Sequence, residues 1–273
     1  MNKRSTQILL VLSAALTLLL VLGVTVQADT FRDAGKAYLR GDFSTFIQLL
    51  KPLAEQGDAR AQYNLGYMYA RGEGVPKDYA EAFKWYKRAA EQGHGEAQLS
   101  LGYLYQTGVG IPQDHVEAIK WYKLASEQGY TRAQYNLGYM YARGKGGIQD
   151  YVKAVKWFKK AAEQGHAKAQ YSVGLMYAKG RGVPQDYAEA IKWYKKAAEQ
   201  GLAYAQYNLG DMFYKGKGVQ QDYVSAYFWL NLSAAGRDNE VSELRDVLKK
   251  KMTPAQIEEA EKLTQEWWEK HNK

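Results

Sequence analysis

The sequence predicts an all-α fold, a solenoid in which antiparallel helix hairpins stack into an α/α superhelix. The first observation is a repeat. The stretch AQYNLGYMY at residue 61 returns as AQLSLGYLY at 97, AQYNLGYMY at 133, AQYSVGLMY at 169 and AQYNLGDMF at 205, with a period of 36 residues. The second is that apolar residues within each period recur at helical spacing. The third is that each period carries two sets of helix end signals, which predicts two helices per repeat.

The first helix of the repeat is predicted over residues 59–71 in the first full period. Its apolar or small residues are Ala61, Leu65, Met68 and Tyr69. The loop GEGVPKD ends it, because glycine permits positive φ and Pro76 disfavours continued helix. This glycine loop resembles a phosphate cradle, but it recurs in five periods and no hydrophobic strand precedes it. We therefore interpret it as a turn between two helices and expect no nucleotide cofactor.

The second helix is predicted over residues 79–92. Asp78 is a suitable N-cap, with Glu81 three residues later, and Gly93 lies where helices commonly end. A tryptophan recurs in this helix at Trp85, Trp121, Trp157, Trp193 and Trp229. It is interpreted as core between the two helices. The alternative is a ladder of rings that stack on sugars.

The chain is predicted to divide into three parts. Residues 1–28 form a signal peptide, and residues 238–273 form C-terminal capping helices. Residues 29–237 form the repeat solenoid, with one short N-terminal unit and five full repeats starting near 59, 95, 131, 167 and 203. The short unit is expected because terminal repeats have one neighbour only.

The N-terminal segment predicts export to the periplasm or secretion. Lys3 and Arg4 precede an apolar run from Ile8 to Val26, and Val26-Gln27-Ala28 fits a cleavage site after Ala28. The alternative is an uncleaved inner-membrane anchor, because the run is nearly long enough to span a bilayer. After cleavage no stable membrane span is expected.

The predicted cap follows from the last repeat. Lysines that recur on the second helix give way there to Phe228, and Leu230 and Leu232 are apolar neighbours. Such a face needs cover, and residues 239–251 and MTPAQIEEAEKL carry apolar stripes at helical spacing. Thr253, Pro254 and Gln256 form the start signal of the last helix.

The repeat AQYNLGYMYARGEGVPKDYAEAFKWYKRAAEQG strongly resembles the Sel-one-like repeat (SLR) family, a relative of tetratricopeptide repeats, over residues 34 to about 236. The resemblance implies a right-handed superhelix of helix pairs. It also implies a protein that assembles other proteins, in envelope signalling, assembly or host interaction when exported. Some similar proteins are regarded as β-lactamases, but those are rich in cysteine and this chain has none.

No catalytic, cofactor or metal site is predicted. The four histidines show no ligand spacing, and no nucleophile elbow or paired general acid and base is present. The net charge of +8 and the 23 tyrosines suit nucleic-acid binding in principle, but export argues against it. The chain is therefore expected not to be an enzyme and not to bind nucleic acid.

One face of the first helix is predicted to bind a partner. Positions 60, 63, 67 and 71 are three, four and four apart, so they share a face, which lines the concave groove in tetratricopeptide proteins. Across the repeats this face is rich in tyrosine and cations. The predicted groove residues are Arg60, Tyr63, Tyr67, Arg71, Tyr103, Arg132, Tyr135, Tyr139, Arg143, Lys168, Tyr171, Lys179, Tyr207 and Lys215.

The expected partner is a protein or peptide with acidic groups and aromatic or apolar anchors, because tyrosine and arginine are frequent interface anchors. A second hypothesis is an envelope polysaccharide or peptidoglycan, with an anionic glycan held by tyrosine stacking and cations. An ordinary solvated face with packing between repeats is the third interpretation of the same residues.

Overall fold

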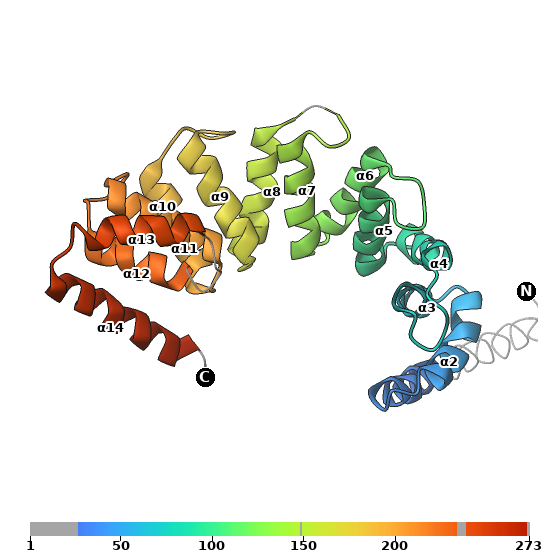
Figure 1. The fold of residues 1–273 in the computed structure, drawn as a ribbon. Coiled ribbons are helices and arrows are strands. Elements are labelled where there is room, and N and C mark those ends of the chain that lie inside the picture. The colour runs from blue at the N-terminus through green and yellow to red at the C-terminus, as the bar shows by residue number, and fades with distance from the viewer. Residues whose placement is uncertain (1–26, 148, 234–238, 272–273) are drawn as a thin grey trace, which may run out of the picture. The chain divides into compact units, whose positions relative to one another are not determined.

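The structure is a computed structural model that describes residues 27–147, 149–233 and 239–271 (Figure 1). Residues 1–26 of the predicted signal peptide lie outside the described residues. Residues 27–39 are helical. No helix in the described ranges has both the length and the apolar character that crossing a bilayer requires.

The described chain consists of helices joined by short loops (Figure 1). After the helical residues 27–39, the helices are α2 (Phe43–Glu55), α3 (Ala59–Arg71), α4 (Tyr79–Glu91), α5 (Gly95–Thr107), α6 (His115–Glu127), α7 (Thr131–Arg143), α8 (Tyr151–Glu163), α9 (Ala167–Lys179), α10 (Tyr187–Glu199), α11 (Ala203–Lys215), α12 (Tyr223–Ser233), α13 (Asn239–Lys249) and α14 (Pro254–His271). The all-α prediction is confirmed, with two helices in each 36-residue period.

The chain divides into two compact units, one up to Leu124 and one from Ala125, so the division falls within α6. In unit 1, α3 packs against α2 and α4, and α4 packs against α5. In unit 2, each helix from α7 to α12 packs against the next. Each unit is therefore a stack in which a helix pair contacts the preceding and the following pair, as in a solenoid.

Both predicted end signals of the repeat act as expected. Gly72 follows α3 with φ of +74°, a left-handed conformation that side chains with a Cβ rarely adopt, and its N–H donates to Met68 O. The Asp78 carboxylate accepts from the backbone N–H groups of Ala80 and Glu81 at the start of α4. The short loop between them reverses the chain, so the two helices form a hairpin.

The two helices of a hairpin approach closely because a glycine faces an aromatic ring. A Cβ built on Gly174 of α9 would lie 2.6 Å from the ring of Tyr194 on α10. The same pairing joins Gly66 to Tyr86, Gly102 to Tyr122 and Gly138 to Phe158. Any side chain at these glycines would displace the ring, so the glycine sets the distance between the helices.

The recurring tryptophan packs between repeats. Trp121, Trp157 and Trp229 are at most 8% exposed, whereas Trp85 and Trp193 are half-buried. Trp121 of α6 is in one cluster with Ala89 and Ala90 of α4 and with Ala97 and Leu101 of α5. This burial supports the interpretation as core, and it leaves Trp121, Trp157 and Trp229 too little exposed surface to form a ladder for sugars.

Buried glutamines tie each repeat to the one before it. The side-chain amide of Gln62 donates to Ala54 O at 3.0 Å, and Gln98, Gln134, Gln170 and Gln206 make the equivalent bond at 3.1–3.2 Å. Gln92 in turn donates to the Gln62 side chain at 2.7 Å. These bonds explain the Ala-Gln and Glu-Gln-Gly segments of the repeat, since buried amides need partners.

The last two helices cover α12. Leu230 of α12 is fully buried in a cluster with Val241, Leu248, Met252 and Ala260. Helix α14 begins with reciprocal bonds, in which Thr253 N–H donates to Gln256 Oε1 at 2.9 Å and Gln256 N–H donates to Thr253 Oγ1 at 3.3 Å. The apolar face of the last repeat is thus removed from water.

Candidate functional site

The predicted groove residues lie on the odd-numbered helices α3, α5, α7, α9 and α11. The cations among them are exposed, and the tyrosines are half-buried except for Tyr103, which is 52% exposed. Half-buried tyrosines follow from the packing, since Tyr135 lies 5.8 Å from the Phe158 ring. The body of such a tyrosine therefore supports the hairpin while part of its surface remains accessible to solvent.

A hollow lies within unit 2, and we call it the tyrosine hollow. It encloses about 490 Å³ and is bounded by α7, α8, α9 and the start of α11. Its lining residues are Tyr135, Tyr139, Ala142, Arg143, Gln149, Tyr151, Phe158, Lys168, Tyr171, Ser172, Leu175, Met176, Lys179, Arg181, Leu202 and Tyr204. The structure therefore brings together six predicted residues, namely Tyr135, Tyr139, Arg143, Lys168, Tyr171 and Lys179.

A smaller hollow lies within unit 1. It encloses about 250 Å³ between Gly35, Tyr38, Phe46, Tyr63, Asn64 and Tyr67, two of which were predicted. The remaining predicted residues line neither hollow: Arg60, Arg71, Tyr103, Arg132, Tyr207 and Lys215. Tyr207 instead packs against the cluster around Leu230 under the cap.

Among the described residues, the tyrosine hollow is lined by cations and by no carboxylate. Arg143, Lys168, Lys179 and Arg181 line it, no carboxylate does, and none of the four forms an ion pair with another described residue. Four like charges around one concave surface create a positive potential that attracts anions. This charge makes the hollow suited to an acidic ligand.

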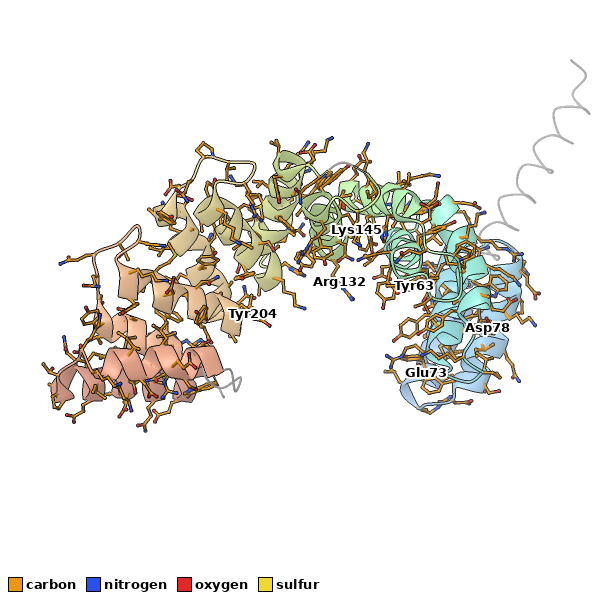
Figure 2. All side chains as sticks on the ribbon, turned by 45° about the horizontal axis from the view of Figure 1, so that its top comes forward. Tyr63, Glu73, Asp78, Arg132, Lys145 and Tyr204 are labelled. Atoms are coloured by element: carbon orange, nitrogen blue, oxygen red, sulfur yellow. The ribbon has the colours of Figure 1, made fainter. Side chains whose placement is uncertain are left out.

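Three equivalent cations elsewhere form ion pairs within the chain. In unit 1, Arg60 pairs with Asp58 at 3.7 Å and Arg71 pairs with Glu73 at 2.9 Å. In the last repeat, Lys215 pairs with Asp211 at 2.6 Å. Figure 2 labels Glu73 of unit 1 and Lys145, which occupies the equivalent loop position of unit 2. The predicted row of cations is therefore uneven. Arg143, Lys168 and Lys179 line the tyrosine hollow and form no ion pair with a described residue, and Arg132 likewise forms none but lies outside the lining.

Aromatic contacts hold the hollow in shape. The His166 ring stacks on Tyr135 with centroids 4.7 Å apart, and Arg143 and Arg181 lie over the rings of Tyr139 and Tyr151 at 5.6 and 5.3 Å. These cation–π contacts orient both guanidinium groups, and the rings carry no net charge that would neutralise them. Tyr204, which is labelled in Figure 2, is 69% exposed at the edge of the hollow.

The ionisation of the hollow is set by arginine and lysine. Burial, followed by the charges of Lys168 and Arg132, lowers the pKa of His166, so its ring is neutral at pH 7. Its Nδ1 then accepts from Ala169 N–H at 3.2 Å as the N-cap of α9. Burial raises the pKa values of Tyr135 and Tyr171, so both keep their hydroxyl hydrogen as a donor. Every ionised group of the hollow is therefore positive.

Sequence reasoning missed Tyr151, Arg181 and Leu202 of the hollow. Tyr151 begins the second helix of one repeat, and Arg181 and Leu202 lie in loops, so none of them shares the face from which the prediction was made. A signal for Arg181 existed. Its column reads Glu73, Val109, Lys145, Arg181 and Lys217, which changes from acidic to basic along the chain.

The arrangement offers groups that can bind an anion. Among the described residues, no group of three or more histidine, aspartate or glutamate side chains is placed to hold a metal ion. The hollow contributes tyrosine hydroxyls, arginine and lysine donors, and apolar surface from Phe158, Leu175 and Met176. These groups recognise carboxylates or phosphates together with aromatic or aliphatic side chains.

Comparisons with known proteins agree with this architecture. The profile of the Sel1 repeat matches residues 59–94, 95–130, 131–166, 167–202 and 203–238. A protective antigen of uropathogenic Escherichia coli strains with an SLR fold is 38% identical, with a TM-score of 0.79 over 90% of this chain. A Sel1 repeat protein from Oxalobacter formigenes is 31% identical, with a TM-score of 0.73 over 86% of this chain. A search of curated proteins found no match.

The two relatives differ in size. The match spans 54% of the Escherichia coli protein, about half its length, and 96% of the Oxalobacter formigenes protein. What is common to all three chains is therefore the stack of repeats.

Proposed function

Because this chain belongs to the Sel1 repeat family, we propose that it is a non-enzymatic scaffold that binds an acidic segment of a protein partner in the tyrosine hollow. Sel1 repeats are helical scaffolds typical of protein-interaction modules. The observation that carries the proposal is the set of four unpaired cations around tyrosine rings, with no lining carboxylate. An exported scaffold of this kind serves envelope signalling, assembly or host contact.

A peptide fits the hollow better than a neutral sugar does. Sugar hydroxyls are strong donors, and the described lining offers them no carboxylate acceptor. It does offer apolar surface from Phe158, Leu175 and Met176, which aromatic or aliphatic side chains can cover. Carboxylates beside such side chains would then pair with Arg143 and Arg181. An anionic glycan uses the same cations, so the test below includes one.

The test uses a fluorescein-labelled twelve-residue peptide with four glutamates around a tryptophan and a leucine. Tyr139→Ala combined with Tyr204→Ala should weaken its binding by about 2 kcal/mol, mainly through faster dissociation, because anchors that bury rings dominate affinity. Arg143→Glu combined with Arg181→Glu should slow association and flatten the salt dependence. Stopped-flow fluorescence at several ionic strengths separates the two effects.

A matched control distinguishes the hollow from any exposed ring. Tyr103→Ala removes a tyrosine that is 52% exposed, lies in unit 1 and lines neither hollow, so it should leave binding unchanged. Equal binding by the wild type and by both hollow variants would rule out this site. Tighter binding of a uronate oligosaccharide than of the peptide would favour the glycan.

Export is part of the same proposal. It rests on Lys3, Arg4 and the apolar run before Ala28, with Val26-Gln27-Ala28 as the cleavage site. Expression in a Gram-negative host followed by N-terminal sequencing of the periplasmic fraction should give a chain that starts at Asp29. Recovery of the intact N-terminus in the membrane fraction would instead show an anchor.

A further inference from the structure

Unit 2 carries a second line of cations along the ends of its first-helix segments. The sequence after each of these helices places a cation on either side of a glycine: RGK at 143–145, KGR at 179–181 and KGK at 215–217. The equivalent segments of unit 1 read RGE at 71–73 and TGV at 107–109. We call the six residues Arg143, Lys145, Lys179, Arg181, Lys215 and Lys217 the cationic rim.

The backbone conformation at the glycine sets where the two cationic residues of each pair lie. Gly144, Gly180 and Gly216 each have φ of +63°, the left-handed conformation that ends the helix. The cation before the glycine lies in the last turn, where the negative end of the helix dipole stabilises it. The cation after the glycine enters the loop, and Arg181 and Lys217 lie over the rings of Tyr151 and Tyr187 at 5.3 and 5.8 Å.

The rim remains positive because little acid lies beside it. All six side chains belong to exposed residues, and in the described chain Lys215 is the one rim cation that forms an ion pair, with Asp211. The nearest following acids are the N-caps Asp150, Asp186 and Asp222. Each already accepts from backbone N–H groups of the next helix, as Asp186 does from Glu189 N–H at 2.9 Å.

We propose that the cationic rim binds an acidic tail of the same partner peptide whose anchors occupy the tyrosine hollow. This inference rests on the proposed function. It adds a binding surface for acidic residues of the peptide that lie beyond the hollow. Arg143, Lys179 and Arg181 line the hollow as well as the rim, so a peptide that leaves the hollow meets rim cations directly. Lys145, Lys215 and Lys217 lie outside the hollow and extend the positive surface to three consecutive repeats.

A peptide is the class that matches both surfaces at once. The apolar lining of the hollow suits apolar or aromatic side chains of a ligand. The rim offers positive charge rather than open rings, because Arg181 and Lys217 lie over the tyrosine rings there. A polypeptide supplies both kinds of group on one chain, while a polysaccharide or an anionic membrane supplies charge without such side chains. Rim contacts are exposed, so they should act through many weak ion pairs that are sensitive to salt.

The experiment appends tails of zero, four or eight glutamates to the twelve-residue peptide and measures the affinity of the full chain for each. The wild type should bind more tightly with each longer tail. Lys145→Glu combined with Lys217→Glu should remove most of this gain, about three- to tenfold, and leave binding of the peptide without a tail unchanged. Both substitutions lie outside the hollow, so the short peptide reports on the proposed function alone.

The control is Lys156→Glu combined with Lys195→Glu, which makes the same charge change on exposed second-helix residues. It should retain the gain from the tail. The inference is overturned if the wild type shows no gain, if the rim variant keeps the full gain, or if the control loses as much as the rim variant. It is also overturned if a heparin oligosaccharide or vesicles with phosphatidylglycerol bind the rim more tightly than the longest peptide.

Discussion

Replacement of Tyr194 by alanine is expected to destabilise the protein by about 3–5 kcal/mol. The Tyr194 side chain is 2% exposed and lies against Gly174, where the absence of a Cβ leaves space for the ring alone. Alanine would leave a cavity between α9 and α10 that neither backbone can fill. Urea denaturation followed by circular dichroism should show the loss as a lower midpoint or as an earlier separate transition of the affected repeat.

Tyr194→Phe is the matched control, because it keeps the ring against Gly174 and removes only the hydroxyl. It should cost much less than the alanine substitution. A wild-type urea midpoint for Tyr194→Ala would contradict the assignment of this ring as the spacer of the hairpin. The same reasoning applies to Tyr122, which is fully buried and donates its hydroxyl to Gln106 at 2.6 Å.

Removal of residues 238–273 is expected to produce a chain that aggregates. The deletion would expose the side chains of Tyr227 and Leu230, which are 0% exposed in the full chain. Uncovered apolar surface of this kind promotes association, and terminal repeats of solenoids generally need a polar outer face. Size-exclusion chromatography with light scattering should show large species at concentrations where the full chain remains soluble.

A point substitution tests the same cover without deleting a segment. Leu248→Ala should cost about 2–4 kcal/mol, because Leu248 is 0% exposed in the cluster with Leu230. Val247→Ala on the same helix changes a residue that is 41% exposed and should have little effect. A truncated chain that stays monomeric and melts like the full chain would show that α13 and α14 do not cap the solenoid.

Much of the fold was readable from the repeat. A period of 36 residues seen five times averages out the ambiguity of any single stretch, and glycine, proline and aspartate mark the helix ends by local chemistry. The first helix was predicted over 59–71 and found at Ala59–Arg71, and the second was predicted over 79–92 and found at Tyr79–Glu91. Signals of this kind act within a few residues, so they do not need the tertiary structure.

The role of individual core residues was less accessible. Helical spacing placed Trp85 and its equivalents in the core, but it did not single out the adjacent Tyr86 column that fits against glycine. Helical spacing also did not explain Gln62 and Gln92, whose side chains form a hydrogen bond between residues 30 positions apart. Both depend on which side chains meet across two helices, and a single helix does not carry that information.

The sequence by itself determined the family, the hairpin repeat and the tyrosine-rich, cationic face of the first helix. The tertiary structure decided which part of that face is an open hollow and which loop residues line it. Arg71 and Arg143 occupy the same position in the repeat, yet Arg71 pairs with Glu73 whereas Arg143 lines the tyrosine hollow. The physical reason is that the field at a charge depends on distances to all its neighbours, including loop residues such as Arg181 that share no helical face with it.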